Sequence, residues 1–516
     1  MATETPIKFE WRLDIEVLIA TIMAPSMVFM VSTALSVALP AIQRDLGATG
    51  ADLIWIVNAY SLLQAAFIFL SGSFGDHYGR KRVYLIGIVI FALSSFVCAT
   101  TDSTDVLIMA RAVQGIGSGL MITCSLAIVA AFFFHHRRSW AIGVWSGFTM
   151  LISGAGPILG GWLTEMGMWR MIFLINIPLS LVAIFILIIY VPESYDEEAP
   201  EELDISGTFL STMALMLSGF FCIEGPRRGF DDPLVLLSGG GAVALIPIFI
   251  WIEGHSDHPM MPLNLFRSRT FTGANTLTLL LYGALNSVLF FLPLSLIQVQ
   301  GYSAAAVGLA LLPMTVLMVA LSFVMSRVFD RYGPRLPLIF GPVLISLSFA
   351  MLATLPPDSG QDSYWRTLFP AVCLFGAGMG VTLAPLTTAV MASVDEHHAG
   401  MASGLNNTVS RSAQVLSIAV MGGIVLVLFK QNLLSDPSVT ALPADARAFL
   451  SAESIKLSET VPPAALTPSE RAQLQDVIRE TFAGAINVIM WIAAGLSLLS
   501  GLLAALLIER ELPFPE

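Results

Sequence analysis

The sequence predicts an all-α polytopic membrane protein, and two observations carry this prediction. Of the 516 residues, 56% are hydrophobic and 12% are charged, whereas charged residues make up about 25% of an average soluble domain. The apolar residues gather in long runs, and a helix of about 20 apolar residues crosses a bilayer. The fourteen predicted spans are 17–39, 53–71, 83–99, 105–131, 139–162, 171–191, 205–223, 234–252, 270–298, 304–326, 337–355, 367–392, 401–428 and 483–508.

Charge and composition exclude several classes of function. The net charge of −12 argues against a nucleic-acid partner, because nucleic-acid-binding proteins carry basic patches. The four cysteines lie in apolar runs and the seven histidines in predicted loops, without the spacing of metal ligands. We expect no metal and no cofactor. We find no P-loop for ATP and no nucleophile or paired carboxylates at membrane depth, so we do not expect an enzyme.

The charges of the loops predict the orientation in the membrane. An even number of spans places both chain ends on one side. The short segments of that side carry most of the Lys and Arg residues, which resist translocation. We therefore expect both termini in the cytoplasm and the chain in the inner membrane, embedded in the lipid bilayer as a monomer.

A repeated motif predicts a duplicated architecture. The polar stretch 72–82 interrupts two apolar runs, and a degenerate copy follows at 326–335. Asp330 follows Asp76 by 254 residues, and Pro293 follows Pro40 by 253. Because two motif residues recur after nearly the same number of residues, the sequence indicates two parallel repeats. The predicted division is a six-helix bundle (1–191), an acidic linker with a two-helix insertion (192–262), and a second six-helix bundle (263–516) with a long outer loop (430–480) that ends in a surface helix (469–482).

The stretch Gly72-Ser-Phe-Gly-Asp76-His-Tyr-Gly79-Arg80-Lys-Arg82 resembles the loop between the second and third helices of the major facilitator superfamily, G-x-x-x-D-x-x-G-R-[KR]-x. The resemblance implies the fold of that superfamily and a cytoplasmic gate formed by Asp76, Gly79 and Arg80, with Asp330 as the counterpart in the second half. The layout of six, two and six helices looks like the fourteen-helix drug:proton antiporter branch.

A second motif lies in the fourth span. Arg111-Ala-Val-Gln114-Gly-Ile-Gly-Ser-Gly119 is similar to the superfamily pattern R-x-x-Q-G-x-G-x-[GA]. Arg111 lies roughly 8–10 Å inside the predicted boundary, where a charge is costly and indicates function. The resemblance implies that Arg111 helps proton transfer. The alternative is a structural charge that is hydrogen-bonded to carbonyls.

In the fifth span, Gly156-Pro157-Ile-Leu-Gly-Gly161 looks like the antiporter motif G-P-x-x-G-G. Proline and clustered glycines permit a kink and close helix contact. The resemblance implies export rather than import, with Gly156 and Pro157 active in the conformational change.

The first span departs from the family pattern. Alignment on Leu39-Pro40 keeps Thr33, but it places Val31 where the antiporters carry an acid and Ser36 where they carry Asn. No acidic residue lies near the middle of any predicted span. A membrane carboxylate would attract a cationic drug, so its absence favours a neutral, amphipathic or anionic substrate.

Polar residues inside other spans are candidates for substrate binding. Two of the three sets given at the end of this paragraph contain three residues each. Helical spacing places the three residues of such a set on one face of their helix. Arg411 lies about 15 Å deep, where it either faces a central cavity or satisfies carbonyls between helices. The candidates are Asn58 and Gln64; Asn275, Tyr282 and Asn286; Asn407, Arg411 and Gln414.

Together these features predict a secondary transporter that exports a small amphipathic or lipophilic molecule in exchange for protons by alternating access. Two other possibilities stay open. One is an exporter of lipids or natural products, or an uptake permease for an anionic metabolite. The other is a membrane-embedded enzyme or receptor.

Overall fold

The structure is a computed structural model that describes residues 11–133, 136–195, 205–256, 263–357, 359–394 and 399–509. Over these residues the secondary structure is helical and contains no strand. Fourteen helical segments are long and apolar enough to cross a membrane. The prediction of an all-α protein with fourteen spans is therefore confirmed.

The helices before residue 191 pack on one another as an N-terminal group. The helix α2 starts with a capping box, in which the Thr49 hydroxyl accepts from the Asp52 N–H and the Asp52 carboxylate accepts from the Thr49 N–H. The short α6 and the longer α7 form the sixth span together. The bounds are α1 (Trp11–Leu46), α2 (Gly50–Tyr78), α3 (Arg80–Thr100), α4 (Thr104–Phe132), α5 (His136–Glu165), α6 (Met171–Leu174) and α7 (Asn176–Tyr190).

The helices after residue 268 form a C-terminal group, apart from short elements named below. Residues 469–482, expected as a separate surface helix, are instead the first turns of a 40-residue helix that starts with a capping box at Thr467. The helix therefore starts at Pro468, well before residue 483, where the last span was predicted to begin. The bounds are α10 (Arg269–Gln298), α11 (Ala304–Ala310), α12 (Leu312–Tyr332), α13 (Arg335–Ala353), η2 (Gln361–Ser363), α14 (Leu368–Ala392), α15 (Ala399–Ser435) and α18 (Pro468–Leu507).

Two further spans, α8 (Ile205–Arg228) and α9 (Pro233–Glu253), precede the short η1 (Leu263–Arg267). The helix α8 packs against α2 of the N-terminal group and α15 of the C-terminal group. A Cβ at Gly423 of α15 would meet the Cys222 carbonyl oxygen, which Pro226 leaves without its helical donor. The helix α8 therefore covers the line along which α2 and α15 meet, and α9 packs against α8.

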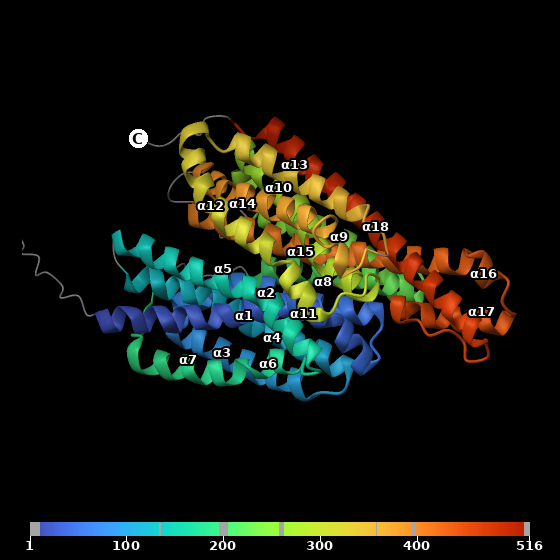
Figure 1. Cartoon of the computed structure of the whole chain (residues 1–516). Coiled ribbons are helices and arrows are strands. Elements are labelled where there is room, and N and C mark those ends of the chain that lie inside the picture. Colours follow the sequence, from blue (N-terminus) through green and yellow to red (C-terminus); the bar gives the residue numbers. More distant parts are fainter. Residues whose placement is uncertain are drawn as a thin grey trace, which may run out of the picture.

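The two groups converge at one end of the molecule and diverge at the other (Figure 1). Beyond the converging end, called the closed end, project α16 (Pro437–Thr440) and α17 (Ala444–Glu453), followed by η4 (Ser454–Glu459). The start of α1 and the end of α18 lie toward the diverging end. Which end faces the cytoplasm stays a prediction from loop charge.

Candidate functional site

A cavity of about 450 Å³ lies between the two helix groups. This volume is within the range of about 300–1,000 Å³ that is usual for small-molecule pockets. Helices of both groups line it, namely α1, α2 and α5 on one side and α10, α12, α14 and α15 on the other. The cavity therefore occupies the place where movement of one group against the other would change access.

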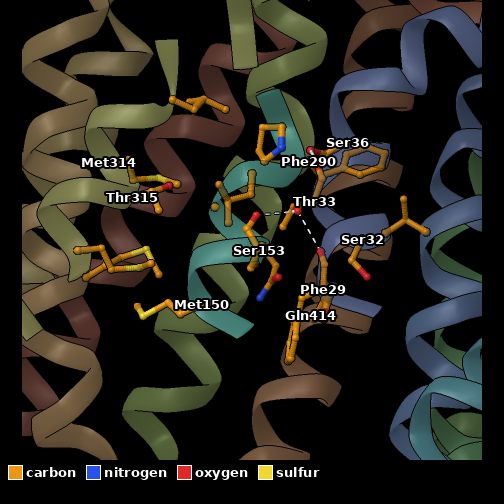
Figure 2. Close-up of a pocket in the computed structure, with 18 of the residues that line it drawn as sticks. Phe29, Ser32, Thr33, Ser36, Met150, Ser153, Phe290, Met314, Thr315 and Gln414 are labelled. Atoms are coloured by element: carbon orange, nitrogen blue, oxygen red, sulfur yellow. Dashed lines mark hydrogen bonds between the residues drawn. The ribbon is translucent and has the colours of Figure 1, made fainter. Parts of the chain in front are cut away.

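Most of the cavity wall is apolar, with scattered hydroxyls. Flexible thioethers adapt to molecules of different shape. Figure 2 places Met314 and Thr315 on one side of the cavity and Ser32 and Ser36 of α1 on the other. The apolar wall includes Phe29, Met150, Phe290, Met314, Met318 and Met379. The hydroxyls belong to Ser32, Thr33, Ser36, Thr149, Ser153 and Thr315.

Three of the predicted binding residues, Asn286, Arg411 and Gln414, line this cavity. An Arg411 N–H donates to Gln414 Oε1 at 3.3 Å. Among the described residues that line the cavity, none is Asp or Glu. Val31, at the position of the missing acid, is fully buried in packing and does not line it. The described wall therefore carries a cation without a carboxylate.

The other five candidates do not line the cavity: Asn58, Gln64, Asn275, Tyr282 and Asn407. Gln64 Nε2 donates to the Ser118 hydroxyl at 3.0 Å inside the N-terminal group. Asn275 Oδ1 accepts from Asn406 Nδ2 at 3.1 Å inside the C-terminal group, and Asn407 is exposed. Helical spacing predicted which residues share one face of a helix, but the cavity extends along only part of the length of each helix.

Pro157 and Thr33 are linked across α5 and α1. Pro157 has no N–H, so the carbonyl of Ser153 loses its helical donor. The Thr33 hydroxyl lies 2.9 Å from that carbonyl oxygen and 2.9 Å from the Phe29 carbonyl oxygen of its own helix, and its one proton is shared between the two acceptors (Figure 2). A Cβ at Gly156 would clash with the same hydroxyl. An unsatisfied carbonyl is costly in hydrocarbon, so Thr33 stabilises the proline-containing helix beside the cavity.

Glycines also bring α5 against α11 of the other group. A Cβ at Gly161 would meet the Ala304 carbonyl oxygen, and a Cβ at Gly308 would meet the Pro157 carbonyl oxygen. The two backbones therefore touch directly. Of the motif residues, Pro157 lies at this seam between the groups, whereas Gly156 faces α1 within its own group.

The polar stretch 72–82 comprises the end of α2, Gly79 and the start of α3, and it forms a tight turn at Gly79. Arg80 Nε donates to Asp76 Oδ1 at 2.8 Å. Gly79 has a φ of +103°, a conformation that favours glycine. Glu193, after α7, accepts from the Lys81 N–H at 2.8 Å, where its charge is favourable at the start of α3. The sequence alone did not identify Glu193 as part of this turn. The feature that could have indicated it is the position of an acidic residue directly after the sixth span.

For Asp330, the predicted counterpart of Asp76, the structure describes the backbone but not the side chain. Its backbone belongs to α12. A gating role for Asp330 stays a prediction.

Arg111 lies inside the N-terminal group and away from the cavity. Its side chain is only 1% exposed. Its Nε donates to the Ile56 carbonyl at 3.2 Å, another N–H donates to Gln114 Oε1, and the guanidinium carbon lies 4.0 Å from the centre of the Tyr60 ring. Gln114 Nε2 donates to the Ser95 hydroxyl at 2.7 Å. The predicted pair therefore joins α2, α3 and α4, and its role in proton transfer stays a prediction.

Polar contacts join the two groups at the closed end. Gln298 Nε2 donates to Gln43 Oε1 at 2.9 Å, and Gln298 Oε1 accepts from the Ser458 hydroxyl at 2.6 Å. Gln43 Nε2 donates to the Lys456 carbonyl at 2.9 Å. Nearer the middle, Asn58 donates to a carbonyl of α15 at 3.2 Å. The segment η4 therefore binds both groups.

Comparisons with known proteins agree with this architecture. The sequence model of the Major Facilitator Superfamily matches residues 21–418. The chain is 32% identical to the multidrug resistance protein Stp of Mycobacterium tuberculosis, over 80% of this chain and 76% of that protein. It is 30% identical to the tetracenomycin C resistance and export protein of Streptomyces glaucescens, over 94% of this chain and 90% of that protein.

Solved structures share the fold. A bacterial homolog of the human lysosomal transporter Spinster, in an inward-facing and unoccupied conformation, superposes with a TM-score of 0.63 at 17% identity, over 95% of this chain and 97% of that chain. The xylose transporter XylE from E. coli, in an inward open conformation, gives 0.55 at 12% identity, over 97% of each chain.

The fold and the central cavity define a multi-pass membrane transporter, which in a bacterium lies in the inner membrane. The chain belongs to the Major Facilitator Superfamily, whose members are transporters and not enzymes. The resemblance inferred from the motifs is confirmed.

The hydrogen bond from Thr33 to Ser153 is testable by a double-mutant cycle. Thr33→Val should cost about 1 kcal/mol of stability, because it leaves the Ser153 carbonyl without a donor. In a Pro157→Ala background, residue 157 supplies an N–H to that carbonyl, so Thr33→Val should cost much less. Thermal unfolding of the purified variants measures both steps. Equal costs in the two backgrounds would contradict this interpretation.

Gly79→Ala should destabilise the protein by at least about 1 kcal/mol, because the positive φ strains any Cβ. The new Cβ would also lie 2.7 Å from the Glu193 carboxyl carbon. Gly147→Ala is the matched control, since that helical site has open space and alanine favours a helix. Thermal unfolding should separate the two variants, and equal melting temperatures would contradict the expected strain.

Proposed function

We propose that this chain is a proton-coupled efflux transporter that exports amphipathic or lipophilic compounds by alternating access. The observation that carries the proposal is the thioether-rich and phenyl-rich cavity between the two helix groups. Such a wall binds apolar molecules of varied shape, and the hydroxyl and amide groups add hydrogen bonds without requiring one substrate geometry.

Export is supported by the relatives. One is named for multidrug resistance, and another, named for tetracenomycin C resistance and export, aligns with 94% of this chain. The G-P-x-x-G-G motif lies at the seam between the groups, where its backbone touches α11. Export of a toxic compound is therefore the direction that we assign.

Alternating access requires the closed end to open. With the orientation expected from loop charge, the diverging end faces the cytoplasm and receives substrate. The contacts among Gln43, Gln298 and Ser458 then break while the diverging end closes. The seam between α5 and α11 consists of close backbone contacts, so it can slide without separating long side chains.

We assign the coupling and gating roles as follows. Asp76, Gly79 and Arg80, with Asp330 in the second half, stabilise the ends of the helices that close on the cytoplasmic side. Arg111 and Gln114 respond to proton binding through their buried network. No nucleotide is consumed, since the energy comes from the proton gradient.

A second candidate function follows from the charge of the cavity. Arg411 and the lack of a carboxylate among the described lining residues favour an exporter of lipids or natural products, or an uptake permease for an anionic metabolite, over a pump for cations.

Proton coupling is tested in proteoliposomes with an imposed pH gradient and a pH-sensitive dye inside. Cationic, neutral and anionic amphiphiles are added in turn. A transported compound should dissipate the gradient, and Asp76→Asn should slow this flux about tenfold or more, a loss of roughly 1.4 kcal/mol in transition-state stabilisation. Empty liposomes are the control. Transport without any proton movement would reject antiport.

The opening of the closed end is tested by cross-linking. In a background with the native cysteines replaced by alanine, Gln43→Cys and Gln298→Cys should react with a bismaleimide and lose transport, because the groups can no longer separate. The control pair, Asp45→Cys with Arg170→Cys, replaces a 2.6 Å ion pair within the N-terminal group at the same end. That pair should keep transport when cross-linked. Unimpaired transport by the first pair would contradict alternating access through this end.

A further inference from the structure

Arg411 is a cation on the wall of the cavity, far from either end of its helix. It follows Ala399, the first residue of α15, by twelve residues, or about 18 Å along the helix axis. Its side chain donates to Gln414 Oε1 at 3.3 Å, and this amide is neutral. Among the described lining residues no carboxylate is present to balance the charge.

Other arginines of the chain have a different arrangement. Arg80 pairs with Asp76 at 2.7 Å and Arg170 with Asp45 at 2.6 Å, and both pairs lie at helix ends. Arg111 is enclosed by a carbonyl, an amide oxygen and an aromatic ring, and does not reach the cavity. Arg411 thus combines membrane depth, access to the cavity and a neutral partner.

A guanidinium in a low-dielectric cavity gains much from an anion, because burial of a charge without an opposite charge is costly. Its planar N–H groups match carboxylate, sulfonate or phosphate oxygens. The rest of the wall is suited to an apolar body, with the phenyl rings and thioethers of both groups around the same space. Figure 2 shows Gln414 on one flank of the cavity, with Met314 and Phe290 further along it.

We infer that the transported molecule is an acidic amphiphile whose anionic group pairs with Arg411 and Gln414 while its apolar part contacts the methionine and phenylalanine wall. This inference rests on the proposed function, since it names the substrate class of the same cavity. The acid belongs either to a soluble aromatic acid or to the headgroup of an anionic lipid. Both present the same oxygen anion to Arg411.

Two dyes with one skeleton test the charge preference. 8-Anilino-1-naphthalenesulfonate is anionic, and N-phenyl-1-naphthylamine is its neutral counterpart. Binding to the purified protein in nanodiscs of zwitterionic lipid is measured by fluorescence, with empty nanodiscs subtracted. Arg411→Gln should weaken binding of the sulfonate about tenfold or more, as expected for loss of a hydrogen bond to a charged group, and should leave the neutral dye nearly unchanged.

Two further variants keep the test decisive if Arg411→Gln folds poorly. Arg411→Lys retains the positive charge and should retain part of the preference for the sulfonate. Gln414→Glu places a carboxylate beside Arg411, so it should lower sulfonate affinity and raise the melting temperature through an internal ion pair. Parallel changes for both dyes in all three variants, or no change for either, would overturn the inference.

Competition experiments distinguish whether the natural acid is a lipid headgroup or a soluble molecule. An anionic phospholipid added to the nanodiscs should displace the sulfonate if the natural acid is a lipid headgroup, whereas displacement by soluble aryl carboxylates alone assigns a soluble acid. Stabilisation of the wild type by chloride that Arg411→Gln abolishes, with sulfonate affinity unchanged by the same substitution, would identify a simple counter-ion at Arg411 and overturn the inference. Because binding needs no gradient, a wild-type protein that binds the sulfonate no better than the neutral dye, yet keeps proton-coupled transport, would reject this inference alone.

Discussion

In a bilayer no water can bind a backbone carbonyl that has lost its helical donor, and this constraint organises the centre of the molecule. Pro157 creates such a carbonyl in α5, and Thr33 of α1 supplies the missing hydrogen bond. Pro25 creates another in α1, where the Thr21 carbonyl accepts from Trp145 Nε1 of α5 at 3.2 Å. Each proline therefore frees a carbonyl that ties its own helix to the neighbouring one. The pair α1 and α5 gains a fixed relation beside the cavity.

The same constraint explains where the two helix groups can move. At the α5–α11 seam the backbones approach through Gly161 and Gly308, so van der Waals contact replaces interlocking side chains. At the closed end the groups meet through the side-chain amides of Gln43 and Gln298 and through η4. Such polar contacts can exchange for water once that end opens. Close packing at the seam and exchangeable contacts at one end are suited to rocking.

Buried charges, like buried carbonyls, need polar partners, and the two intramembrane arginines differ in the partners that they have. Within the N-terminal group, Arg111 is satisfied by a carbonyl, by Gln114 and by the ring of Tyr60, so its charge is shielded from the cavity. Arg411 is held by one neutral amide and borders open space. Two intramembrane arginines that look alike in a hydropathy plot therefore have different surroundings. That difference makes one a candidate for coupling within a helix group and the other a candidate for substrate binding.

The sequence by itself determined the all-α class, the fourteen spans and the family, because a membrane helix must be long and apolar whatever its neighbours are, and because the polar motif around Asp76 is local. It also placed Arg411 and Gln414 on one helical face. Only the tertiary structure decided which polar residues meet the cavity, because that depends on depth along each helix and on the neighbour it faces. Thr33 and Glu193 act on backbone groups far away in the chain, and no local pattern reveals such pairs.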